Sequence, residues 1–253
     1  MTSVILLKIG GSVLTNKAQA HTVRKENLHA VARQIADAKR TDLVLVHGAG
    51  SFGHPQAAKY LSDHFSVSGL WKTHRSVTSL NTRLVNELQS YDVPALPIHP
   101  LSSITLDAGR IVRFEMKALQ LMLRNGIVPV IHGDVALDSS ESYNILSGDQ
   151  ILAFLAQKIQ PEKIGIGTDV DGIIFRGKTI EYLNANEFEK YRQEIVGSDA
   201  TDVTGGMLRK VSELVEIAKI GIQSQVFNAT RDGNVAKFLT SDQKIGTTIC
   251  AKE

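Results

Sequence analysis

The sequence lacks several features that define other classes of protein. Its 253 residues include one cysteine, Cys250, which excludes an internal disulfide and fits a reducing compartment. No apolar run approaches the roughly 20 residues that span a bilayer. The apolar stretch at residues 4–9 contains a lysine and ends in two glycines, so it does not predict a signal peptide. We therefore expect a cytoplasmic protein that does not associate with a membrane.

Charge and composition narrow the class further. The 28 basic and 26 acidic side chains give a net charge of only +2, which makes no general case for binding nucleic acid. The hydrophobic fraction of 43% is ordinary for a globular protein. No linker, repeat or low-complexity segment divides the chain, and we therefore expect one large domain.

Apolar runs alternate with helical patterns along the chain. Five runs predict buried strands, at residues 4–9, 43–46, 127–131, 163–166 and 224–227. Apolar residues spaced three or four apart predict helices at residues 27–39, 114–125, 149–157 and 207–220. The polar segment 64–89 predicts a helix after Lys72, and residues 173–180 predict two short strands around a turn. This alternation predicts an α/β fold with a mainly parallel sheet that is covered on both faces.

Two of the predicted strands run directly into glycines. The first gives Lys8-Ile9-Gly10-Gly11-Ser12, and the second is followed by His47-Gly48-Ala49-Gly50-Ser51-Phe52-Gly53-His54. Glycines let backbone N–H groups approach an anion, and a helix that follows adds its favourable N-terminus. Lys8 is either an edge residue that reaches solvent or part of an anion site, because a buried lysine is costly unless it is paired. A lone histidine is more often structural, yet His54 ends a phosphate-type loop, where it can hold a substrate oxygen. The two junctions together suggest that two phosphate-bearing groups are brought together.

Three later motifs carry further candidates. Asp149, in Ser147-Gly148-Asp149 before a predicted helix, is either a helix cap or an anchor that orients lysines by ion pairing. The segment Thr168–Gly172 follows a strand and is either a simple acidic turn or a contact to a nucleoside. Thr204-Gly205-Gly206 precedes a helix with Lys210 in its first turn, where a phosphate gains N–H donors and a positive charge. The chain has no G-x-x-x-x-G-K-[ST] element and is therefore not a P-loop kinase.

In this order and combination, the motifs resemble those of the amino acid kinase superfamily across nearly the whole chain. That resemblance implies a three-layer α/β/α sandwich around a mainly parallel sheet. Within the superfamily, the Lys8 junction and the loop ending in His54 are similar to those of isopentenyl phosphate kinases, in which this histidine contacts the acceptor phosphate. The implied reaction transfers a phosphoryl group from ATP to isopentenyl phosphate, in the alternative mevalonate pathway of isoprenoid biosynthesis.

The resemblance also implies residue roles, Mg²⁺ as a cofactor and a homodimer. The implied catalytic residues are Lys8, Lys17, His54, Asp149 and Lys210. The implied ATP-binding residues are Lys8, Ile9, Gly10, Gly11, Ser12, Gly50, Thr168, Asp169, Asp171, Gly172, Gly206 and Lys210. The implied acceptor-binding residues are Ala49, Gly50, Gly53, His54, Ser147 and Gly148. We expect one amino acid kinase domain over residues 1–253, with an acceptor-binding part up to about residue 160 and a nucleotide-binding part after it.

Two other functions on the same fold stay open at this point. A phosphonate kinase of the fosfomycin type would share ATP and the histidine, because its acceptor is also a phosphorus oxyanion. A non-catalytic nucleotide sensor would not need the lysines and the histidine that this chain retains. An isoprenoid tail also needs an apolar slot, for which the candidates are Leu70, Val77, Leu80, Leu84 and Ile145, although each of the leucines and the valine also fits an ordinary core.

Overall fold

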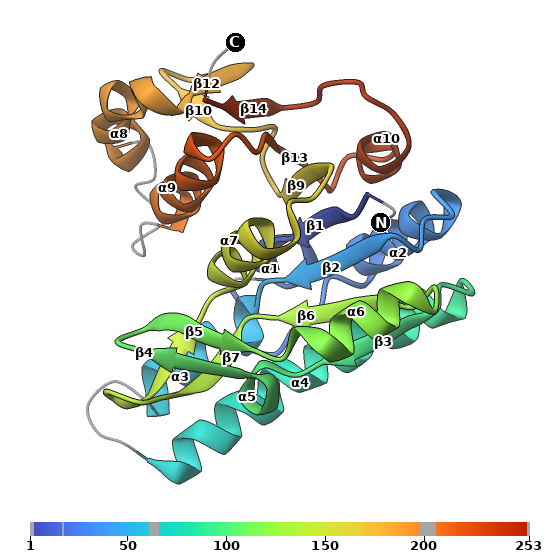
Figure 1. Cartoon of the computed structure of the whole chain (residues 1–253), viewed down its shortest axis with the longest axis vertical. Coiled ribbons are helices and arrows are strands. Elements are labelled where there is room, and N and C mark those ends of the chain that lie inside the picture. The colour runs from blue at the N-terminus through green and yellow to red at the C-terminus, as the bar shows by residue number, and fades with distance from the viewer. Residues whose placement is uncertain (1–2, 17, 61–65, 198–205, 252–253) are drawn as a thin grey trace.

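An eight-stranded sheet forms the middle layer of the structure (Figure 1). The computed structural model describes residues 3–16, 18–60, 66–197 and 206–251. Across the sheet the strands follow in the order β12 (Tyr182–Asn184), β14 (Thr247–Cys250), β13 (Ser224–Asn228), β9 (Lys163–Thr168), β1 (Ile5–Ile9), β2 (Leu43–His47), β6 (Val128–His132) and β3 (Ala95–Ile98). Neighbouring strands run parallel except β13 and β14, which confirms the predicted mainly parallel sheet.

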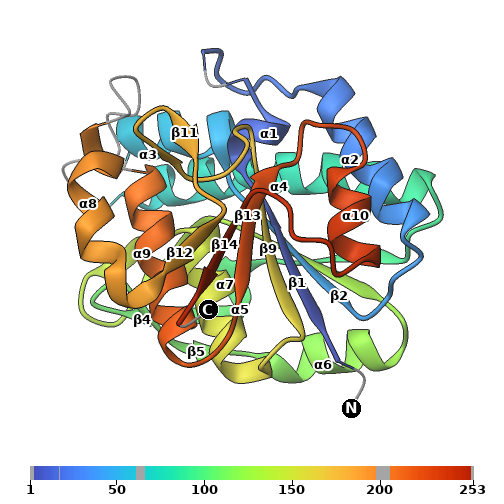
Figure 2. The same cartoon turned by 90° about the horizontal axis from the view of Figure 1, so that it is seen from above.

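Helices cover both faces of this sheet, as the view from above shows (Figure 2). The helices that pack on one face are α6 (Met116–Arg124), α7 (Gly148–Ile159), α8 (Phe188–Gly197) and α9 (Gly206–Lys219). Those on the other face are α1 (Gly11–Leu14), α2 (Lys25–Asp37), α4 (Val67–Ser90) and α10 (Asn234–Thr240). The remaining helices are the short α3 (His54–Tyr60) and α5 (Pro100–Ser103) and the 3₁₀ turns η1 (Gly50–Phe52) and η2 (Ala185–Glu187). The three-layer α/β/α prediction is therefore confirmed.

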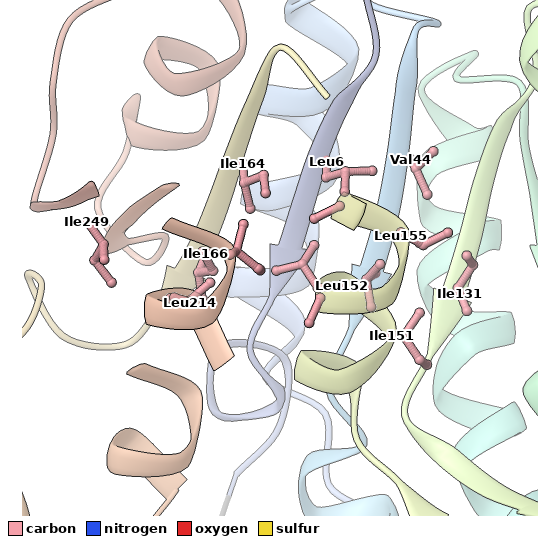
Figure 3. Packing of buried hydrophobic residues seen from close by; sticks show 14 of the residues in the cluster. Leu6, Val44, Ile131, Ile151, Leu152, Leu155, Ile164, Ile166, Leu214 and Ile249 are labelled. Carbon is pink, nitrogen blue, oxygen red and sulfur yellow. The ribbon is translucent and has the colours of Figure 1, made fainter. Parts of the chain in front are cut away.

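The alternation of side chains along β1 decides which residues reach each layer. Ile5, Leu7 and Ile9 are buried in the cluster on the α2 and α4 face, whereas Leu6 belongs to the cluster on the α7 face. Figure 3 shows Leu6 and the neighbouring Ile164 opposite the leucines of α7. Because successive side chains of a strand point to opposite faces, Lys8 leaves the sheet on the same side as Leu6. The alternation of side chains along β1 therefore points Lys8 toward α7.

Two smaller sheets were not predicted in full. A four-stranded sheet has the order β5 (Arg110–Phe114), β4 (Ile104–Asp107), β7 (Asp134–Asp138) and β8 (Ser142–Leu146). The hairpin of β10 (Ile174–Phe175) and β11 (Lys178–Thr179) confirms the strand-turn-strand prediction for residues 173–180. Strand β7 begins two residues after β6 ends, so the four-stranded sheet starts at the edge where β6 finishes.

Several predicted boundaries need correction. The helix expected from Phe114 begins at Met116, because Phe114 pairs with Ile104 as the last residue of β5. Helix α4 begins at Val67 rather than after Lys72, because the Ser66 side chain caps it by accepting a hydrogen bond of 3.1 Å from Gly69 N.

The candidate residues for an apolar slot were mostly core residues. Val77, Leu80 and Leu84 are fully buried in the core between α4 and the sheet, so they cannot line an open slot. Leu70 is half-buried, and Ile145 on β8 is 48% exposed. Among the described residues, no helix has the length and apolar character of a membrane span.

Candidate active site

The parallel strands of the sheet end side by side, and this brings the predicted motifs together. In the register of the sheet, Ile9 of β1 pairs with His47 of β2 and with Gly167 of β9, and His47 pairs with His132 of β6. The backbone ladder continues beyond the strands, with Gly10 N donating to Gly167 O at 2.8 Å, Gly48 N to Ile9 O at 3.0 Å and Gly133 N to His47 O at 2.9 Å. The loops that follow β1, β2, β6 and β9 therefore form one continuous edge.

Gly11 and the loop after β2 approach more closely than any side chain would allow. A Cβ atom built on Gly11 would lie 2.5 Å from Gly50 Cα, and one built on Gly48 would lie 2.6 Å from Gly11 N. Thr15 fastens the same contact, because its Oγ1 donates to Gly11 O at 2.7 Å and accepts from Ser51 N at 3.0 Å. The two glycine junctions thus form a single backbone surface, as an anion site made of N–H groups requires.

The buried Lys8 is paired with Asp149. Lys8 Nζ lies 2.6 Å from Asp149 Oδ1, and the two side chains are 5% and 18% exposed. Asp149 stands in the first turn of α7, whereas Ser147 caps that helix by accepting a hydrogen bond from Gln150 N. Of the two roles left open for Asp149, the contacts therefore support the anchor for a lysine and give the cap to Ser147. Such a pair holds an ammonium group at the strand ends without leaving the charge uncompensated.

A second polar link joins the β1 and β9 loops. Ser12 Oγ donates to Asp169 Oδ1 at 2.7 Å. Asp171, two residues further on, accepts a hydrogen bond of 2.9 Å from Asn228 Nδ2 and is ion-paired with Arg231. Thr168 is buried and donates to Val170 O at 2.8 Å, so its hydroxyl shapes the turn. The segment Thr168–Gly172 thus lies beside the β1 junction on one side and the loop after β13 on the other.

The acceptor candidates lie on the opposite side of the β1 junction. His54 is exposed at the first residue of α3, directly after Gly53. Gly148 lies against Lys8, since a Cβ on Gly148 would be 3.2 Å from Lys8 Cε. A Cβ on Gly133 would lie 3.2 Å from Gly148 N and 3.6 Å from Ala49 N. The loops that carry Ala49, Gly133 and Gly148 therefore meet here, and Gly148 lies against the Lys8 side chain.

The structure describes only part of the predicted lysine and glycine motifs at Lys17 and at residues 204–210. Gly206 begins α9, and Lys210 is half-buried in the first turns of this helix, which packs against α7. Lys17 lies outside the described residues, as do Thr204 and Gly205 of the glycine motif. The catalytic roles assigned to Lys17 and Lys210 stay predictions.

Sequence reasoning missed a cluster of histidines along the same edge. His47 Nδ1 donates to Gly48 O at 3.0 Å and its Nε2 accepts from Asn81 Nδ2 at 3.1 Å. His132 repeats the pattern with Gly133 O and accepts from His99 Nδ1 at 3.0 Å. Burial lowers the pKa of His47 to about 4 and lowers that of His132 well below its ordinary value, so both rings are neutral at pH 7. The signal in the sequence was a His-Gly pair at the end of two predicted strands.

The described residues do not fit a protein-bound metal ion. No group of three or more His, Cys, Asp or Glu side chains among them is arranged to hold one. The buried histidines use their ring nitrogens within the cluster, and Asp149 and Asp169 are paired with Lys8 and Ser12.

Comparisons with known proteins show the family to which this chain belongs. The amino acid kinase family profile matches residues 3–228, and the chain belongs to this family. The isopentenyl phosphate kinase of Methanocaldococcus jannaschii is 36% identical over 252 aligned residues, which cover 94% of this chain and 95% of that protein. The isopentenyl phosphate kinase of Methanothermobacter thermautotrophicus is 34% identical, with 98% of this chain and 100% of that protein covered. A solved isopentenyl phosphate kinase structure superposes with a TM-score of 0.84 at 31% identity, over 97% of this chain and 100% of the other.

Proposed function

We propose that this chain transfers the γ-phosphoryl group of ATP to isopentenyl phosphate, giving ADP and isopentenyl diphosphate. The observation that carries the proposal is the meeting of three glycine loops around the Lys8–Asp149 pair, with His54 at the end of one of them. The high similarity to isopentenyl phosphate kinases over nearly the whole chain supports the choice of acceptor.

The chemistry asks for little beyond positioning and charge. The acceptor is already a phosphate, so its attacking oxygen is ionised at neutral pH and needs no strong general base. The difficulty is that two anions repel each other, and fixed positive groups solve it by stabilising the charge of the transferring group. In our proposal Lys8, Lys17 and Lys210 surround that group, and His54 holds the acceptor phosphate.

The loops divide these tasks between the two substrates. N–H groups of Gly11, Ser12 and Gly50 bind the transferring phosphate, with Gly206 at the start of α9 on the nucleotide side. The N–H group of Gly10 does not take part, because it already donates to Gly167 O. The segment Thr168–Gly172 faces the nucleoside, and the residues after about 160 form the nucleotide-binding part. The acceptor lies along Ala49, Gly53, His54, Ser147 and Gly148. Asp149 orients Lys8 between the two.

Three further features belong to the same proposal. Mg²⁺ would be needed to neutralise phosphate charge and would be held chiefly by the substrates, because no group of described side chains is arranged to hold a metal ion. The enzyme is a cytoplasmic homodimer, in keeping with its similarity to isopentenyl phosphate kinases and with its single cysteine.

A product assay by ³¹P NMR tests the proposal directly. ATP is supplied with a panel that contains isopentenyl phosphate, other small monophosphates and fosfomycin. We expect a diphosphate product that depends on isopentenyl phosphate. A preference for fosfomycin by orders of magnitude would replace the acceptor with a phosphonate, and tight ATP binding without any turnover would replace the kinase with a sensor.

Lys210 provides a test of the nucleotide side. Because we place its ammonium at the ATP phosphates, the Lys210→Ala variant is expected to raise the KM for ATP and to leave the KM for isopentenyl phosphate within about twofold. Steady-state kinetics with each substrate varied in turn measure both constants. An effect confined to the acceptor KM would assign Lys210 to the other phosphate.

A further inference from the structure

A buried carboxylate stands next to the candidate acceptor site and is not used by the mechanism above. Asp134 directly follows Gly133, the residue that lies against Gly148 N and Ala49 N. Its side chain is 0% exposed. Oδ1 accepts a hydrogen bond of 2.8 Å from Val135 N, and Oδ2 accepts one of 2.7 Å from His74 Nδ1. Taking a carboxylate out of water is unfavourable unless it is paired, and His74 is the cationic partner that the fold supplies.

The pair fixes which nitrogen of the His74 ring always carries a proton. Since Nδ1 carries the proton that is donated to Asp134, the free choice is whether Nε2 is protonated as well. The carboxylate raises the pKa of His74 above its ordinary value, although burial of Asp134 raises the pKa of that carboxyl too. The 2.7 Å contact stabilises both charges together and therefore favours the ionised pair near neutral pH.

The surroundings of His74 leave Nε2 weakly engaged. Nε2 lies 3.5 Å from Thr78 Oγ1, which is at the outer limit of a hydrogen bond. His99 meets the ring edge-on with centroids 6.0 Å apart, and burial and the His74 charge lower its pKa. His132 Nδ1 lies 3.9 Å from Asp134 Oδ2 and is neutral. Among the contacts described for the His74 ring, the charged partner is Asp134, and the His74 side chain is 26% exposed.

The residue before His74 carries a polar atom without a hydrogen-bond partner among the described residues. Thr73, the preceding residue of α4, is 3% exposed, and its Oγ1 has no hydrogen-bond partner among the described residues. A buried hydroxyl without a partner is uncommon, because its desolvation is not compensated. Of these two neighbouring side chains, the buried Thr73 is closed off, and His74 is the one that a ligand can reach.

We propose that His74 is a second imidazole of the acceptor site, which donates a hydrogen bond from Nε2 to an anionic oxygen of the acceptor while Asp134 holds its ring in place. This inference rests on the proposed function for the identity of the acceptor. His74 acts on the acceptor and not on ATP, because Asp134 follows Gly133 on the side of Ala49 and Gly148. His74 is a binding residue and Asp134 a positioning residue.

Kinetics of His74→Gln test the proposal against a matched control. The control is His29→Gln. His29 is also paired with a carboxylate, since its Nδ1 lies 2.8 Å from Glu87 Oε1 of α4, but this pair is at an exposed position. At pH 6.5 we expect His74→Gln to raise the KM for isopentenyl phosphate about tenfold, with the KM for ATP unchanged, and we expect no change in His29→Gln. The defect of His74→Gln should shrink toward pH 9, where the ring of the unaltered protein has lost its Nε2 proton.

The Asp134→Asn variant tests whether Asp134 positions the His74 ring or only stabilises the fold. We expect it to raise the acceptor KM at pH 6.5 and to lower the pKa of the His74 ring, which is measured from its ¹⁵N resonances. A purely structural role would lower the melting temperature of both variants without a pH-dependent change in the acceptor KM, and that result would overturn the proposal.

A titration without turnover keeps this inference separate from the proposed function. Isopentenyl phosphate added to the unaltered protein should shift the His74 Nε2 resonance and raise the pKa of the ring, while the His29 resonances stay unchanged. If the protein makes no diphosphate, the proposed function fails, and the His74 proposal still stands or falls with this shift. An unchanged His74 resonance at saturating isopentenyl phosphate, or fosfomycin if that proves to be the acceptor, refutes it.

Discussion

The contact between the two glycine junctions makes Gly11→Ala the most direct perturbation of the site. The added Cβ would lie 2.5 Å from Gly50 Cα, where ordinary contact begins near 3.4 Å, so the two backbones must separate by about 1 Å. Gly50 cannot yield easily, since Thr15 ties its loop to Gly11 O and Ser51 N. Overpacking of this kind costs about 1–3 kcal/mol of stability. For a chain of this length that lowers the melting temperature by about 2–4 °C per kcal/mol.

The expected kinetic effect is larger than the loss of stability. A misplacement of about 1 Å in the groups that hold the reacting phosphates lowers the rate by about 10²-fold, or about 2.7 kcal/mol in the transition state. We therefore expect kcat/KM for isopentenyl phosphate to fall by about 10²-fold at a temperature where Gly11→Ala is fully folded. Coupled ADP release measures the rate, and thermal unfolding followed by circular dichroism measures the stability.

Gly221→Ala is the control for stability alone. Gly221 has a φ of +86° and open space around a built Cβ, and it lies between α9 and the start of β13, at the other end of the sheet. An alanine there is strained by about 1–2 kcal/mol through its left-handed backbone, without touching the site. It should lower the melting temperature and keep kcat/KM. If Gly11→Ala keeps kcat/KM within twofold of the unaltered protein, the close approach of the two loops is not needed for the reaction.

Three further predictions concern charge. Asp149→Asn keeps an oxygen for Lys8 but removes the countercharge, and kcat is expected to fall by about 10²-fold in the same assay; unchanged kcat would exclude Asp149 as the anchor. His54→Ala should lower kcat/KM for the acceptor by at least about tenfold, or about 1.4 kcal/mol, with the ATP KM unchanged in steady-state kinetics; an unchanged value removes His54 from the mechanism. Since Asp134 raises the folded-state pKa of His74 above the unfolded value near 6.5, this protonation stabilises the fold fully below about pH 6.5 and is lost as pH rises through the folded pKa. The melting temperature of the unaltered protein should accordingly exceed that of His74→Gln most at pH 6 and less at pH 9, and a gap that widens with pH contradicts the pairing.

Five strands of the large sheet and the loops after them were predictable because their signals are local, whereas the short strands β3, β12 and β14 of that sheet were not predicted. A buried parallel strand is a continuous apolar run, and residues 43–46 and 163–166 needed only one or two residues added at their C-terminal ends. The small sheet was harder to predict. Arg110–Phe114 alternates weakly, and its pairing with Ile104–Asp107 depends on a hairpin packed against α7. The apolar pattern of the following helix therefore includes Phe114, which is the last residue of this strand.

The candidate site divides in the same way. Lys8, His54 and the glycines carry motifs that are contiguous in the sequence, so their chemistry could be inferred before the fold was known. His74 could not be found, because its partner Asp134 is 60 residues away and the pair is defined only by the packing of α4 beside β7. The role of Asp149 was ambiguous for a related reason, since a helix cap and an ion-pair anchor occupy the same first turn.

By itself, the sequence determined the local features of the chain. It showed which runs are buried strands, which glycines follow them, and that a lysine and a histidine stand at the ends of two of these strands. Tertiary structure alone decided which side chains meet. Parallel register aligned the ends of β1, β2, β6 and β9, and Lys8 met Asp149 across 141 residues of sequence. The physical reason is that backbone conformation and burial follow from near neighbours in the chain, whereas the pairing of charges depends on distances in space that only the packed layers establish.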